Sequence, residues 1–147
     1  MNTMHDTKHI RRIISSSFKE TMDIGKELAA ELKPGDIIYL YGELGSGKTV
    51  FVKGLCIGLG VEEEVTSSSF VIATDYKGRL PVAHIDLYRL EAEALDMLPV
   101  EEYIVDKGIT MIEWADRLNT KPTTGIHVKI VIDKRNRREL TVEDIRD

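Results

Sequence analysis

The chain has 147 residues, of which 42% are hydrophobic and 31% charged, and its formal net charge is −5. These values fit one globular domain over residues 1–147, with residues 1–9 flexible. No apolar stretch is long enough to span a membrane. Because Cys56 is the only cysteine, an intrachain disulfide and a cysteine-based zinc site are excluded. The acidic balance, and a polar start without the apolar segment of a secretion signal, favour a cytoplasmic protein that does not bind nucleic acid over a broad surface.

Three elements are predicted before residue 42. Residues 10–15 fit a short strand. Ser17 and Glu20 have the spacing of a capping box, and apolar residues then recur every fourth position as far as Leu32, which predicts a helix. The apolar residues 37–41 predict a strand that leads directly into a glycine-rich segment.

That segment, residues 42–49, reads G-E-L-G-S-G-K-T and is a complete phosphate-binding loop. Its glycines allow backbone N–H groups to point inward around phosphates, and Phe51, Leu55 and Leu59 predict the helix that leaves the loop. We expect Lys48 to face solvent and neutralise the β- and γ-phosphates, and the Thr49 hydroxyl to bind Mg²⁺. The residues expected to bind the nucleotide phosphates are Glu43, Leu44, Gly45, Ser46, Gly47, Lys48, Thr49 and Val50.

Strands and helices alternate through the rest of the chain. Residues 70–76 and 80–88 predict two strands, and the two-residue period of the second places His84, Asp86 and Tyr88 on one face. The other predicted elements are helices over 91–98 and 100–105 and strands over 109–112, 125–132 and 139–142. This order predicts an α/β fold, a three-layer P-loop NTPase-like domain whose central sheet is partly parallel and partly antiparallel.

Two carboxylates are candidates to complete a Mg²⁺-phosphate site. Glu113 follows the apolar strand 109–112 in the arrangement called Walker B, and Asp86 lies on the polar face of an earlier strand. Either could hold the ion, with Glu113 the stronger candidate. Residues 66–69 form a Ser/Thr run where many phosphate-loop enzymes sense the γ-phosphate, although a plain turn has the same composition. Trp114, taken alone, reads as a core residue.

Several stretches together resemble one family, the TsaE (YjeE) ATPases of tRNA threonylcarbamoyladenosine biosynthesis. The most specific are H-I-D-L-Y-R-L over 84–90 and I-E-W over 112–114, and the phosphate loop, residues 65–70 and residues 101–103 also fit. The resemblance implies that Thr49 and Glu113 hold Mg²⁺, that Asp86 and Trp114 are needed for hydrolysis or complex function, and that Lys48 holds phosphates. It further implies adenine contacts from Thr21 and from Arg137 or Arg138.

The resemblance also implies a cofactor, a reaction and partners. The protein would hydrolyse ATP with Mg²⁺, slowly by itself and faster in a complex with the transferase subunits TsaD and TsaB, and would meet tRNA only through that complex. The residues leave two alternatives open. A small-molecule kinase shares the loop, although the arginines after the loop are too scattered to predict its usual lid. A nucleotide-dependent binding module that does not hydrolyse ATP would have the same motifs.

Overall fold

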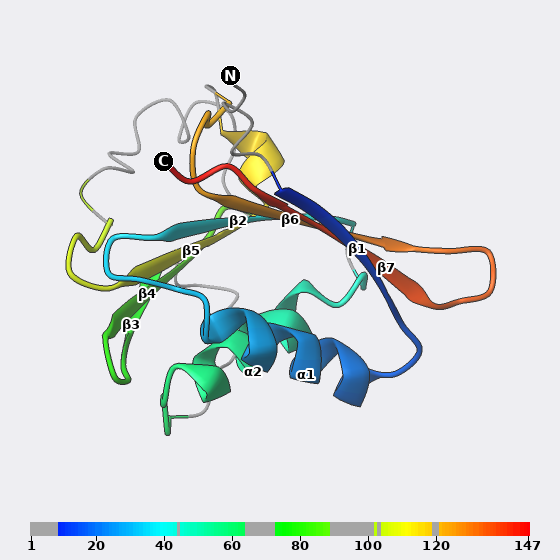
Figure 1. Ribbon diagram of the computed structural model, residues 1–147, viewed down its shortest axis with the longest axis horizontal. Coiled ribbons are helices and arrows are strands. Elements are labelled where there is room, and N and C mark those ends of the chain that lie inside the picture. The colour runs from blue at the N-terminus through cyan, green and yellow to red at the C-terminus, as the bar shows by residue number, and fades with distance from the viewer. Residues whose placement is uncertain (1–8, 44, 64–72, 89–101, 103, 119–120) are drawn as a thin grey trace, which may run out of the picture.

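The computed structural model describes residues 9–43, 45–63, 73–88, 102, 104–118 and 121–147. Within these residues it contains one sheet of seven strands, two α-helices and a short 3-10 helix (Figure 1). The elements run in the order β1 (His9–Ser15), α1 (Phe18–Ala29), β2 (Ile37–Tyr41), α2 (Lys48–Gly58), β3 (Ala73–Lys77), β4 (Pro81–Asp86), β5 (Ile109–Glu113), η3 (Ala115–Arg117), β6 (Ile126–Ile132) and β7 (Arg138–Asp144).

The sheet has the strand order β1-β7-β6-β2-β5-β4-β3. Strand β2 pairs in parallel with both β5 and β6, and β4 pairs in parallel with β5. The pairs β1–β7, β6–β7 and β3–β4 are antiparallel. The predicted α/β fold with a mixed sheet is therefore confirmed, and its parallel centre places the carboxyl ends of β2, β5 and β4 side by side.

Local sequence signals account for the N-terminal elements. Ser17 caps α1, because its side chain accepts a hydrogen bond from the Glu20 N–H at 3.1 Å. The Glu20 carboxylate in turn accepts a hydrogen bond from the Ser16 N–H at 3.1 Å. The predicted strand at residues 10–15 is present as β1, which begins at His9 and lies at one edge of the sheet. The flexible segment predicted at the N-terminus falls, apart from His9, outside the described residues.

Hydrophobic residues pack on both faces of the sheet. Helices α1 and α2 lie side by side against one face, and η3 lies over the other (Figure 1). The larger core, which includes Phe51 and Leu55, lies between the sheet and helices α1 and α2. A smaller core, which includes Ile112 and Ala115, lies on the face of the sheet that η3 covers. No described helix is long and apolar enough to cross a membrane.

Several predicted elements reach beyond the described residues. The start of the predicted strand 70–76, the helix 91–98 and the Ser/Thr run 66–69 lie outside them. Of the predicted helix 100–105, the described residues Ile104 and Val105 are not helical, and Glu102 belongs to a 3-10 turn. The backbone N–H of Val105 instead binds the Thr110 hydroxyl at 2.9 Å, at the start of β5.

Glycines allow α1 and α2 to approach closely. A Cβ atom added to Gly54 of α2 would lie 2.0 Å from the Met22 carbonyl oxygen of α1, and one added to Gly25 would lie 2.5 Å from the Phe51 carbonyl oxygen. Glycine inside a helix is unfavourable by roughly 1 kcal/mol compared with alanine. These glycines are therefore explained by packing, which fixes α2, and with it the phosphate loop, against α1.

Gly54→Ala should destabilise the protein by about 3 kcal/mol, near the upper end for overpacking, because the added methyl group meets backbone atoms that cannot rotate away. Urea unfolding followed by circular dichroism measures the change. Lys53→Ala on the same helix is the control and should stay within about 0.5 kcal/mol of the parent. A Gly54→Ala protein as stable as the control would show that the helices can separate without cost.

Candidate functional site

The phosphate loop connects the end of β2 to the first turn of α2. Gly42, Gly45 and Gly47 have φ angles of 148°, 82° and 111°, in the region that favours glycine. Gly42 also passes close to β6, since an added Cβ would lie 2.6 Å from the Ile130 carbonyl oxygen. Helix α2 begins at Lys48, so its first N–H groups face the loop and form an anion-binding end.

The loop's side chains are only partly described. Leu44 lies outside the described residues, Glu43 and Gly45 are exposed, and Thr49 and Val50 are half-buried in the first turn of α2. Ser46 is 1% exposed, and among the described side chains its hydroxyl alone is buried without a hydrogen-bond partner. A buried hydroxyl without a hydrogen-bond partner costs about 1–3 kcal/mol.

Lys48 is buried, contrary to our expectation that it faces solvent. It is 5% exposed, and its ammonium group donates hydrogen bonds to the carbonyl oxygens of Gly42 and, at 3.2 Å, Glu43. It also lies 3.6 Å from the centre of the Trp114 ring. Burial lowers the pKa of Lys48, and the carboxylates of Glu113, Asp116, Asp86 and Glu43 oppose that shift.

The two candidate carboxylates end neighbouring strands. Asp86 of β4 pairs in register with Glu113 of β5, and Glu113 in turn pairs with Leu40 of β2, just before the loop. Asp86 accepts a hydrogen bond from the Tyr88 N–H at 3.0 Å. Burial raises the pKa of Asp86, the Tyr88 hydrogen bond opposes this, and the Glu113 carboxylate adds to it.

These groups match the chemistry of a Mg²⁺-phosphate site. Mg²⁺ in such sites takes one or two protein oxygens together with phosphate oxygens and water, so it needs no cage of side chains. None of the described residues form a cluster of three or more metal-ligating side chains. Thr49 in the first turn of α2, and Glu113 and Asp86 at the adjacent strand ends, are the residues that would hold the ion.

His84 contacts Glu113 and has no role in the predictions from sequence. Its imidazole Nε2 donates a hydrogen bond to Glu113 Oε2 at 2.5 Å, and the two side chains are only 5% and 3% exposed. The alternation along β4 places His84 on the same face as Asp86. The pairing of β4 with β5 brings this face next to Glu113, and alternation within one strand does not predict which strands pair.

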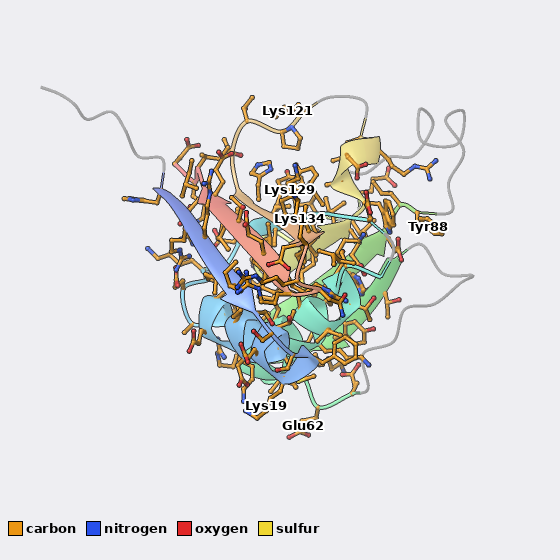
Figure 2. All side chains as sticks on the ribbon, turned by 90° about the vertical axis from the view of Figure 1, so that its right-hand side faces the viewer. Lys19, Glu62, Tyr88, Lys121, Lys129 and Lys134 are labelled. Carbon is orange, nitrogen blue, oxygen red and sulfur yellow. The ribbon has the colours of Figure 1, made fainter. Side chains whose placement is uncertain are left out.

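Trp114, whose ring contacts Lys48, has an unusual backbone conformation. Its φ of 59° and ψ of 42° are left-handed, which is rare for a bulky residue and redirects the chain between β5 and η3. The Trp114 ring also contacts Tyr88, whose ring centre lies 4.7 Å away. Tyr88 is 36% exposed and lies at the margin of the molecule (Figure 2). A continuous line of contacts therefore runs from Lys48 to the surface.

The residues expected near adenine differ in their relation to the loop. Arg138 donates from Nε to the Ser46 carbonyl oxygen at 3.0 Å and from Nη2 to that of Gly45 at 3.3 Å. Arg137 instead binds Asp133 at 2.9 Å within the β6–β7 hairpin. Thr21 is buried, and its hydroxyl is 2.6 Å from the Ser15 hydroxyl. Of the two arginines, the structure brings Arg138 alone to the loop.

A pocket of about 260 Å³ adjoins Arg138. Its lining residues are Ser15, Ser16, Ser17, Phe18, Asn136 and Arg138. Thr21 does not line the pocket, although its hydroxyl contacts that of Ser15, which does. Phe18 is 68% exposed, so an aromatic side chain is available in the pocket beside Arg138.

A glycine-rich loop between a parallel strand and a helix, with acids at the two adjacent strand ends, defines a P-loop nucleotide-binding protein. The family model described as threonylcarbamoyl adenosine biosynthesis protein TsaE matches residues 15–140. The chain belongs to this TsaE family.

Individual relatives agree with the family match. The chain is 36% identical to the tRNA threonylcarbamoyladenosine biosynthesis protein TsaE of Treponema pallidum, over 89% of this chain and 98% of that protein. It is 40% identical to the protein of the same name from Bacillus subtilis, over 84% and 78% of the two chains. It is also similar to the crystal structure of Bacillus subtilis YdiB, with 33% identity, a TM-score of 0.75 and coverage of 95% and 88%.

Proposed function

We propose that this protein binds ATP with Mg²⁺ at the phosphate loop and hydrolyses it in support of tRNA threonylcarbamoyladenosine biosynthesis. The observation that carries this proposal is the meeting of Lys48, Glu113 and Asp86 where β2, β5 and β4 end, together with the family match. A single domain over residues 1–147 and a cytoplasmic location, where ATP and tRNA are available, belong to the same proposal.

Each residue of the site has a proposed task. Lys48 leaves the carbonyl groups of Gly42 and Glu43 and binds the β- and γ-phosphates, which the N–H groups of the loop and of Val50 surround. Thr49 and Glu113 hold Mg²⁺, which neutralises charge on the phosphates. Asp86, whose burial raises its pKa, orients the attacking water or supports the ion. Arg138 and the pocket that it lines receive the adenosine part.

The proposed partners are the transferase subunits TsaD and TsaB, and tRNA is met only through them. The net charge of −5 argues against independent tRNA binding, since binding to nucleic acid depends on cationic contacts with phosphates. The line of contacts from Lys48 through Trp114 to Tyr88 supports partner control, because it connects the phosphate site with an exposed ring.

The test is phosphate release from ATP by the purified protein, measured alone and with TsaD and TsaB. The proposal expects slow release alone and faster release in the complex. Transfer of phosphate to a metabolite would favour the kinase alternative. Tight ATP binding without release, even with both subunits, would favour the non-hydrolysing module.

Trp114→Ala should lower the partner-stimulated hydrolysis rate by about tenfold, the size of a typical coupling between two sites, and change ATP affinity by less than threefold. The reason is that the ring contacts both Lys48 and Tyr88. Trp114→Phe keeps an aromatic face and should retain most of the stimulation. A Trp114→Ala protein that is stimulated like the parent would remove Trp114 from this role.

A further inference from the structure

Strand pairing makes His84 the neighbour of a proposed metal-binding residue. In the β4–β5 register, His84 is opposite Met111 and Asp86 is opposite Glu113. Because side chains two residues apart on a strand share a face, His84 and Glu113 are diagonal neighbours on the face that also carries Asp86. The 2.5 Å hydrogen bond from His84 Nε2 to Glu113 Oε2 joins them.

Burial makes this hydrogen bond important for the carboxylate. Glu113 is 2% exposed, and a carboxylate removed from water needs donors to remain charged. Among the described residues, His84 is the donor that Glu113 Oε2 finds, and the second oxygen, Oε1, forms no hydrogen bond with them. His84 therefore fixes one oxygen of Glu113, and Oε1 is the oxygen that would face the cation or its bound water in the proposed function.

We propose that His84 is a positioning residue, which orients the Glu113 carboxylate for the Mg²⁺ that accompanies ATP. The inference rests on the proposed function, in which Glu113 faces the ion. Groups that hydrogen-bond to metal ligands fix the orientation of those ligands, and their loss typically lowers metal affinity about 10- to 100-fold. An apolar side chain at position 84 could fill the same space but could not hold the carboxylate in one orientation.

The decisive comparison uses His84→Gln and His84→Asn. The glutamine amide nitrogen can reach the place of imidazole Nε2, whereas the shorter asparagine side chain reaches only the place of Nδ1. ATP affinity is measured by calorimetry with Mg²⁺ and again with a chelator, and thermal unfolding followed by circular dichroism identifies the variants that fold. Wild type and Glu113→Gln are measured in parallel.

We expect His84→Asn and His84→Ala to lose about tenfold or more in affinity for ATP with Mg²⁺, and to stay within twofold of wild type when the metal is chelated. His84→Gln should remain within threefold of wild type in both conditions. The Gln and Asn variants carry the test if His84→Ala does not fold.

Equal losses with and without Mg²⁺ would overturn the inference, as would a glutamine variant no better than asparagine. If wild type and Glu113→Gln show the expected Mg²⁺ dependence while the His84 variants behave like wild type, the inference alone fails. If wild type gains no affinity from Mg²⁺, the proposed function fails and the inference fails with it.

Discussion

Lys48→Ala is expected to lower ATP affinity about 100-fold, which corresponds to roughly 2.7 kcal/mol, the size of one or two charge-assisted hydrogen bonds lost together. Lys48 is the cation at the centre of the loop, and its present partners are two backbone carbonyl groups that phosphates would replace. Calorimetric titration with ATP measures the change.

The loss of ATP affinity must be separated from a loss of stability, because Lys48 is buried and its ammonium group binds two carbonyl groups of the loop. Thermal unfolding of Lys48→Ala without nucleotide gives that control, and Lys53→Ala, five residues further along the chain, should bind ATP like wild type. Trp114 is the sole tryptophan, so its fluorescence should change when ATP draws Lys48 from the ring in the wild type. An affinity within threefold of wild type in a folded Lys48→Ala protein would contradict the assignment.

Glu113→Gln is expected to slow ATP hydrolysis about 100-fold and to remove most of the affinity gained from Mg²⁺, because it removes the charge that faces the ion. The glutamine side chain has nearly the same shape, and its oxygen can still accept the hydrogen bond from His84. The fold should therefore be retained, so this variant isolates the effect of the charge better than Glu113→Ala. Phosphate release and calorimetry with and without Mg²⁺ measure the two effects.

Asp86→Ala is the matched comparison on the neighbouring strand. It should slow hydrolysis more than it weakens ATP binding, since Asp86 is proposed to orient water or support the ion and not to hold the phosphates. Equal ATP affinities for Glu113→Gln and wild type at every Mg²⁺ concentration would show that Glu113 does not hold the ion.

The sequence alone predicted most of the local structure. The boundaries of β2 follow from its apolar run, the start of α1 from the capping box at Ser17, and the loop from its glycines, because each of these signals depends on neighbours within a few residues. The mixed sheet followed from the order of the elements. The helix expected over 100–105 was not found at Ile104 and Val105, where the Val105 N–H donates a hydrogen bond to the Thr110 hydroxyl oxygen and not to a helical carbonyl group.

The sequence by itself determined that a phosphate loop is present, which acids could complete it and which family the motifs resemble. The tertiary structure decided which residues meet there: His84 with Glu113, Lys48 with Trp114, and Arg138 rather than Arg137 with the loop. It also decided that Lys48 is buried. The physical reason is that these contacts join residues 29 to 93 positions apart. Strand order and register bring those residues within bonding distance, and local periodicity does not encode either of them.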